Sequence, residues 1–117
     1  MALALSARTE ISLHVFHDER SASFAALGIG QHDGVPAVLL CTSGTAAVQF
    51  HAAVVEADHA HVPMLVCTAD RPPELQGVGA PQTINQTNLY GASTRLFIAA
   101  GVADDRHSSK WRAIARD

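Results

Sequence analysis

Apolar runs separated by polar stops divide the chain into alternating strands and helices. Residues 11–16 alternate apolar and polar side chains, a pattern that predicts a strand of about six residues ending at a charged stop. Residues 35–41 and 62–67 are almost continuously apolar, which is typical of strands buried on both faces of a parallel sheet. Residues 94–99 predict a last short strand.

Helical patterns fill the intervals between these strands. Ser21 or Ser23 can cap a helix that extends to residue 30, and residues 45–57 form a wide apolar stripe. Strand and helix then alternate as in right-handed βαβ units, so the fold class is α/β, a single three-layer domain with a parallel sheet covered on both faces.

Both ends of the chain lack the expected helix caps. Residues 2–8 have helical propensity without an N-cap, and Ser108 or Ser109 can cap a terminal helix carrying Trp111 and Ile114 that reaches residue 117 without a C-cap. We therefore expect residues 1–117 to form one incomplete domain, truncated at both ends.

Composition narrows the function classes. Hydrophobic residues make up 48% of 117 residues and charged ones 16%, the balance of one globular domain. The formal net charge of −3, with only eight Lys and Arg, gives no basic stripe for nucleic acid. No apolar run approaches the ~18 residues that span a bilayer, and residues 1–8 do not form a signal peptide, so we expect a cytoplasmic protein without a membrane span.

Cysteine and histidine do not indicate a metal site. Cys41 and Cys67 each end an apolar run, where a small buried hydrophobe is the simplest role. The pair His14 and His17 would point to opposite faces of a strand, and the histidines at 59 and 61 have no further ligand at suitable spacing.

Three loops follow the predicted strands: 17–21, 42–45 and 69–82. Because ligands of open α/β sheets bind at the carboxyl ends of the strands, these loops should face one crevice. The segment 69–91 has no periodicity, and loops of this length inside a domain are usually functional or disordered.

Two charged residues stand out in these loops. Glu19, beside Asp18 and Arg20, could be partly desolvated and share a proton with a ligand nitrogen, or it could be a solvated acid at a helix start. Arg71 offers a planar fork for a carboxylate substrate, or it could form a surface salt bridge to Glu74.

The turn at 42–45 also leaves two interpretations open. Its glycine and small hydroxyl residues leave backbone N–H groups available for an anion or an aromatic ring edge, while Ser43 or Thr45 could simply cap the following helix. A hydrolase is disfavoured because Ser43 lacks the upstream glycine of a nucleophile elbow.

Four ordered segments carry a family resemblance: 16–28 (FHDERSASFAALG), 41–46 (CTSGTA), 68–75 (TADRPPEL) and 79–86 (GAPQTINQ). In this order and at these distances they resemble the N-terminal, pyrimidine-binding domain of the MenD family, the thiamine-diphosphate-dependent synthases of menaquinone biosynthesis. The resemblance runs from about residue 3 to 112. The segment 68–75 is the most specific to this family.

The resemblance implies a transferase reaction. The family decarboxylates 2-oxoglutarate and adds the succinyl-semialdehyde unit to isochorismate, giving 2-succinyl-5-enolpyruvyl-6-hydroxy-3-cyclohexene-1-carboxylate and CO2. Glu19 matches the catalytic glutamate that hydrogen-bonds the pyrimidine ring and favours its imino tautomer. By the same matching, Thr42, Ser43, Gly44 and Thr45 would lie along the pyrimidine, and Arg71 and Gln82 would bind the substrates.

The resemblance also implies what this chain does not supply. The middle domain and the diphosphate-binding domain, which holds thiamine diphosphate through Mg²⁺ or Mn²⁺, have no counterpart in it, and no metal ligand is expected here. The family works as a homo-dimer or tetramer with sites between subunits, so this chain alone should be inactive. The alternative is a small, non-catalytic α/β module that binds an anionic ligand or a partner protein.

Overall fold

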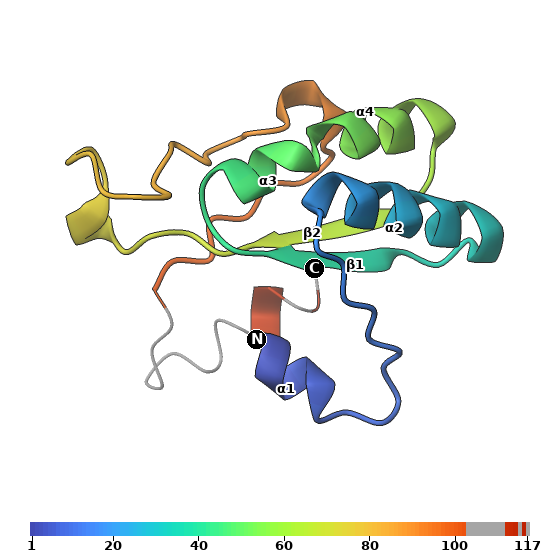
Figure 1. The fold of residues 1–117 in the computed structure, drawn as a ribbon. Coiled ribbons are helices and arrows are strands. Elements are labelled where there is room, and N and C mark those ends of the chain that lie inside the picture. Colours follow the sequence, from blue (N-terminus) through green and yellow to red (C-terminus); the bar gives the residue numbers. More distant parts are fainter. Residues whose placement is uncertain (103–111, 115, 117) are drawn as a thin grey trace.

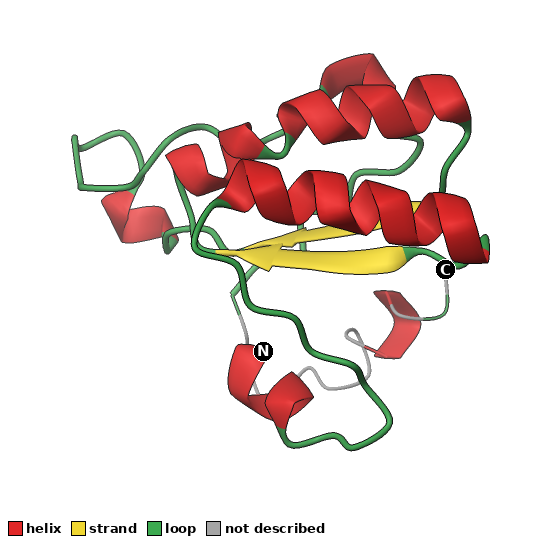
Figure 2. Ribbon diagram, turned by 45° about the vertical axis from the view of Figure 1, so that its right-hand side comes forward, coloured by secondary structure: helices red, strands yellow, loops and turns green. Residues whose placement is uncertain are grey.

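A two-stranded parallel sheet lies at the centre of the chain. The computed structural model describes residues 1–102, 112–114 and 116. Strand β1 (Ala37–Cys41) pairs with β2 (Met64–Thr68), as two of the apolar runs predicted. Helices α2 (Glu19–Asp33), α3 (Thr45–Gln49) and α4 (His51–Ala60) cover one face, and α1 (Ala2–Ser6) lies beyond the other (Figure 1). The α/β fold class is thus confirmed, with helices on both sides of the sheet (Figure 2).

The two faces of the sheet differ in burial. The register pairs Leu39 with Val66 on the face toward the helices, and Leu39 is buried. The next pair, Val38 and Leu65, points to the other face, where these side chains are 54% and 52% exposed. The prediction that both faces are covered is therefore wrong for the described residues, because α1 reaches only the end of the sheet near Leu40.

The core lies between the sheet and the helices α2 and α4. Phe50 is 1% exposed and packs with Ala26 of α2, Leu39 of β1 and Val54 of α4. Complete burial of one such aromatic side chain stabilises a fold by about 1.5–3 kcal/mol. This cluster fixes α2 and α4 against the strands whose ends carry the loops.

Helix α2 begins three residues earlier than a cap at Ser21 predicted, and five earlier than a cap at Ser23. Asp18 is its N-cap: the carboxylate oxygen Oδ1 accepts hydrogen bonds from Ser21 N at 2.7 Å and Ser21 Oγ at 2.8 Å. Ser23, the other predicted cap, lies inside the helix and donates to the carbonyl of Arg20. Aspartate is as good an N-cap as serine, and its negative charge also interacts favourably with the positive end of the helix dipole. The consequence is that Glu19 becomes the first helical residue.

The helix predicted over 45–57 is divided in two. Helix α3 ends at Gln49, and α4 begins at His51 and continues to Ala60. The N–H of Phe50 bonds to the carbonyl of Ala47, three residues back, at 3.3 Å. This tighter turn breaks the α-helical hydrogen-bond pattern at Phe50, the largest side chain of the core cluster.

Two predicted strands do not form. Residues 11–16 and 94–99 are irregular, and the described residues contain only β1 and β2 as strands. Val15 is 84% exposed and Leu96 is 64% exposed. An alternating pattern suits a segment for pairing, but a strand needs a neighbour for its backbone hydrogen bonds, and neither segment has one among the described residues.

The predicted terminal helices are only partly covered by the structure. Helix α1 forms over Ala2–Ser6, within the predicted range 2–8. Residues 112–114 are helical, whereas Ser108, Ser109 and Trp111 of the predicted last helix lie outside the described residues. Among the helices that are described, none combines the length and apolarity required to cross a bilayer.

Candidate functional site

The loops that follow β1 and β2 meet at the carboxyl ends of the strands, as predicted. The N–H of Ala69 bonds to the carbonyl of Cys41 at 3.1 Å and extends the pairing of the strands by one step. Beyond it, the turn at 42–45 contacts the segment that contains Gln82 and Gln86. The first turn of α2 lies over the same end of β1 (Figure 1). Three elements distant in sequence therefore meet at this end of the sheet, the region that we call the crevice.

Glu19 lies near this end of β1 as the first residue of α2. Its side chain belongs to a half-buried residue, whereas Asp18 and Arg20 on either side are exposed. Burial, together with the nearby Glu19 carboxylate, raises the pKa of the Cys41 thiol to about 11. Glu19 is thus within electrostatic reach of the end of β1. It is a helix-start acid, as one interpretation had it, but it is only half solvated.

Arg20, the sequence neighbour of Glu19, forms no ion pair with it. Of the described residues, ion pairs join only Arg8 to Glu10 and His32 to Asp33. The charge of Arg20 instead helps the hydrogen bonds from Ser21 to lower the pKa of Asp18. The carboxylate of Glu19 is therefore available to another partner.

The two cysteines are less buried than predicted. Cys41 and Cys67 are free thiols at half-buried positions, and Cys41 packs against the core cluster. Burial raises the pKa of Cys67 as it does that of Cys41. Both thiols are protonated near neutral pH, which disfavours a nucleophilic role.

The turn at 42–45 is held by the long loop rather than by helix capping. Ser43 is 3% exposed and its Oγ donates to the carbonyl of Gln82 at 2.9 Å. The N–H of Gly44 donates to Gln86 Oε1 at 2.8 Å, so it is not free for an anion. Gly44 is the N-cap of α3 and no side chain caps this helix, which rules out the capping role considered for Ser43 and Thr45.

Arg71 and Gln82 are brought together by the loop after β2. Arg71 Nη2 lies 3.4 Å from Gln82 Oε1, a long hydrogen bond. Arg71 is half-buried, its Nε atom is buried without a hydrogen-bond partner, and it forms no salt bridge with Glu74. A buried guanidinium donor without an acceptor is costly, and the other guanidinium nitrogens of this half-buried side chain are donors that suit an oxygen atom.

Gln86 is the site residue that the sequence interpretation missed. It is 8% exposed and joins both strand ends, because it accepts from Gly44 and donates to Thr68 Oγ1 and the carbonyl of Ala69. A glutamine in an aperiodic loop leaves no pattern that predicts burial. The only available signal was its place at the end of the segment 79–86.

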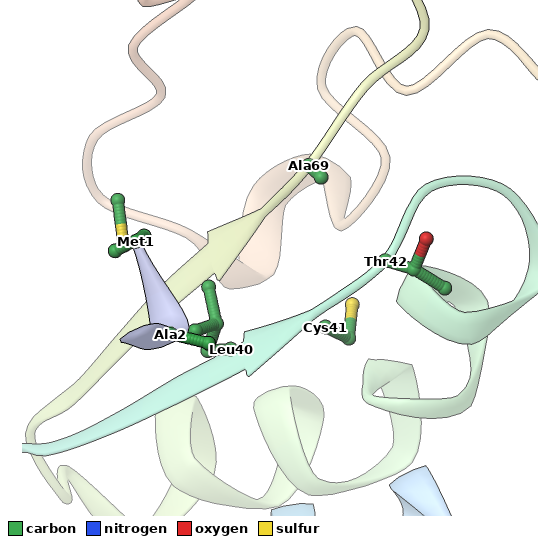
Figure 3. Close-up of a pocket in the computed structure, with 6 residues that line it drawn as sticks. All are labelled: Met1, Ala2, Leu40, Cys41, Thr42 and Ala69. Carbon is green, nitrogen blue, oxygen red and sulfur yellow. The ribbon is translucent and has the colours of Figure 1, made fainter. Parts of the chain in front are cut away.

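A hollow of about 410 Å³ opens between α1 and the ends of the strands, and Glu19, Arg71 and Gln82 are not among the residues that line it (Figure 3). Cys41 and Thr42 follow each other along its wall, and Ala69 faces them from the end of β2. Met1, Ala2 and Leu40 supply an apolar side. Within the described part of the chain, no three His, Cys, Asp or Glu side chains gather closely enough to hold a metal ion.

An α/β domain with a carboxylate at the start of a helix beside the strand ends is a ligand-binding architecture. Residues 1–89 match the family described as thiamine pyrophosphate enzyme, N-terminal TPP binding domain, and the chain belongs to this family.

Its relatives include enzymes named 2-succinyl-5-enolpyruvyl-6-hydroxy-3-cyclohexene-1-carboxylate synthase. The chain is 52% identical over 116 residues to that of Thermobifida fusca, covering 97% of this chain and 21% of the relative. It is 54% identical over 104 residues to that of Saccharopolyspora erythraea, covering 87% and 19%. With that of Lysinibacillus sphaericus the identity is 45% over 124 residues, covering 98% and 22%.

These comparisons confirm the resemblance inferred from the four segments. The chain spans about a fifth of the length of the curated relatives it matches.

Proposed function

We propose that this chain forms the pyrimidine side of the active site in a thiamine-diphosphate-dependent synthase. The reaction is decarboxylation of 2-oxoglutarate and addition of the four-carbon unit to isochorismate, giving 2-succinyl-5-enolpyruvyl-6-hydroxy-3-cyclohexene-1-carboxylate and CO2. The names of the relatives and the segment 68–75 support this choice of substrates. The observation that carries it is the half-buried carboxylate of Glu19 at the end of β1.

The residues at the strand ends fit the pyrimidine half of the cofactor. A half-buried carboxylate that forms no ion pair with another described residue suits a ring nitrogen that must share a proton. The neighbouring thiol of Cys41 is neutral and adds no competing charge. We place the diphosphate and its Mg²⁺ or Mn²⁺ on another domain of a cytoplasmic homo-dimer or tetramer.

Bound thiamine diphosphate supplies the electron sink that allows a 2-oxo acid to lose CO2. Glu19 holds a proton between its carboxylate and the pyrimidine ring nitrogen, which is a positioned general acid–base role. The residues Thr42, Ser43, Gly44 and Thr45 border the ring. Because Ser43 and Gly44 are bonded to the long loop, they act through a rigid backbone, while Thr42 and Thr45 are exposed and can contact the ligand.

Arg71 and Gln82 bind the substrates in this proposal. A substrate carboxylate would pair with the Nη end of the Arg71 guanidinium, and a charge-assisted pair of this kind is among the stronger hydrogen bonds. Gln82 is only 3.4 Å from Arg71 Nη2 and can bond the same substrate through its amide. Both side chains therefore act on one ligand.

A hybrid synthase tests this function. The residues of the Thermobifida fusca synthase that match this chain are replaced by it, and CO2 release and product formation from 2-oxoglutarate and isochorismate are measured. The hybrid should turn over, and Glu19→Gln should lower kcat by about 10²- to 10⁴-fold, since loss of a positioned proton-transfer group has effects of this size.

Glu56→Gln is the matched control. Glu56 lies exposed on α4, outside the crevice. Its replacement by Gln is the same chemical change as at position 19, but it leaves the site unaltered. Its kcat should equal that of the unmodified hybrid. Undiminished turnover in Glu19→Gln would remove the basis for the proposed role, and an inactive unmodified hybrid would contradict the proposed reaction.

A further inference from the structure

Gln86 is bonded to three residues in two segments, the turn after β1 and the end of β2. Its Oε1 accepts from Gly44 N at 2.8 Å, and its Nε2 donates to Ala69 O at 2.9 Å and to Thr68 Oγ1 at 3.1 Å. Both amide N–H groups are thus used, and at 8% exposure the side chain has little access to water. The Gln86 side chain is therefore a buried structural group whose hydrogen bonds are made within the protein, rather than a ligand-binding group. Its three hydrogen bonds are called the Gln86 node.

The node sets the backbone of the turn at 42–45. Gly44 has φ of 81°, a conformation that side chains rarely adopt. A Cβ atom built on Gly44 would lie 2.9 Å from the carbonyl carbon and oxygen of Gln82, so the two backbones are in close contact. Gln86 holds Gly44 in this contact, and Ser43 bonds the same carbonyl of Gln82.

The backbone contact between Gly44 and Gln82 also affects the side chains of Gln82 and Arg71. Gln82 has a φ of 54°, which is uncommon outside glycine, and its amide lies beside Arg71. Moving the turn at 42–45 would therefore move Gln82 and its partner. The three hydrogen bonds of Gln86 couple the wall assigned to the cofactor with the loop assigned to the substrates.

We propose that Gln86 is a positioning residue that fixes the Gly44 turn against Gln82 and so sets the spacing between the cofactor side and the substrate side of the site. Its link to a cofactor and substrates rests on the proposed function. Its hold on Gly44 is a property of this chain alone.

Tyr90 provides a comparison within the same loop. Its hydroxyl donates to the carbonyl of Ala47 at 2.8 Å, and its ring lies edge-on to His51 at a centroid distance of 5.7 Å. This anchor joins the loop to α3 and α4 without a bond to Gly44 or Gln82. Tyr90→Phe removes one buried hydrogen bond, as a structural control should.

The first experiment measures hydrogen exchange of the Gly44 amide by NMR in the 117-residue chain. Gln86→Met, which keeps the length but removes all three bonds, should speed this exchange at least about tenfold, because the amide loses its acceptor. Tyr90→Phe should leave it unchanged. Gln86→Glu keeps an acceptor for Gly44 and should restore part of the protection. Equal Gly44 exchange in wild type and Gln86→Met would overturn the positioning role.

The second experiment uses the hybrid synthase defined above. Gln86→Met should raise the KM for 2-oxoglutarate and lower kcat about tenfold, while Tyr90→Phe changes neither even if its Tm falls equally. Equal kinetic losses in the two variants would mean that Gln86 serves stability only. If the unmodified hybrid shows no turnover, the proposed function fails, and the Gly44 exchange alone decides whether Gln86 positions the turn.

Discussion

Burial and, as the smaller cause, the carboxylate of Glu19 at the start of α2 raise the pKa of the Cys41 thiol at the end of β1. The two residues are 22 positions apart in the printed sequence and belong to different layers of the fold. Their electrostatic interaction places Glu19 close to a thiol whose alkylation rate can be measured directly. It gives a test of the crevice that requires no cofactor.

Glu19→Gln should make Cys41 more reactive toward iodoacetamide. Only the thiolate reacts, and removing the negative charge lowers the pKa of Cys41 from its value of about 11, although burial, the larger cause, remains. A fall of about half a pKa unit would increase the thiolate fraction about threefold at a given pH below the pKa. Alkylation rates between about pH 8 and 9 measure this.

Cys67 is the internal control for that experiment. Its pKa is raised by burial alone, without a contribution from Glu19. Its alkylation rate should be the same in both proteins. An increase at both cysteines would indicate general loosening of the fold, and no increase at Cys41 would contradict the contact.

The glycines of α2 should respond to alanine in opposite directions. A Cβ atom on Gly30 would lie 2.8 Å from the carbonyl oxygen of Pro63 and 2.9 Å from Val62 Cγ1, so Gly30→Ala should destabilise by about 1–3 kcal/mol through overpacking. Gly28 is exposed and has no neighbour within 4 Å, so Gly28→Ala should stabilise by about 0.5–1 kcal/mol. Urea unfolding measures both changes, and similar stabilities for the two variants would refute the close approach of α2 to the start of β2.

The cap of α2 should give the chain an acid-sensitive component of stability. The side-chain hydrogen bond from Ser21, followed by its backbone N–H, lowers the pKa of Asp18 in the folded state. A lowered folded-state pKa means that this contribution is present above the unfolded value of about 3.9 and is lost as the pH falls through the folded-state pKa. The Tm difference between wild type and Asp18→Ala should therefore shrink below about pH 4.

Ser21→Ala distinguishes the contribution of the Asp18 cap from the effect of acid on other carboxylates of the chain. It removes the largest cause of the shift and leaves the carboxylate in place. The pKa of Asp18, followed by NMR titration, should then rise toward its ordinary value. An unchanged pKa would show that the hydroxyl of Ser21 does not bond to Asp18 in solution.

The sequence predicted the elements whose signal is local. The continuous apolar runs became β1 and β2, and the apolar stripes became the helices that cover them. The alternating segments 11–16 and 94–99 failed because alternation describes one strand, whereas pairing depends on a second segment that the pattern does not reveal. The cap of α2 was misplaced because serine and aspartate are equally good N-caps, and only the geometry selects Asp18.

The site was predicted as a set of loops rather than as a set of contacts. The carboxyl-end rule brought 42–45 and 69–82 together correctly. It could not show that Gly44 uses its N–H within the protein, or that Arg71 is left with a buried donor, since both depend on distances between segments. Gln86 was missed for the same reason.

The bonds that assemble the crevice span long stretches of the chain. Ser43 and Gln82 are 39 residues apart, and Gly44 and Gln86 are 42 apart. Loop closure over such separations is entropically unfavourable until the intervening strands and helices have packed. We therefore expect the crevice to assemble last during folding and to open first in partial unfolding, while the cluster around Phe50 remains intact.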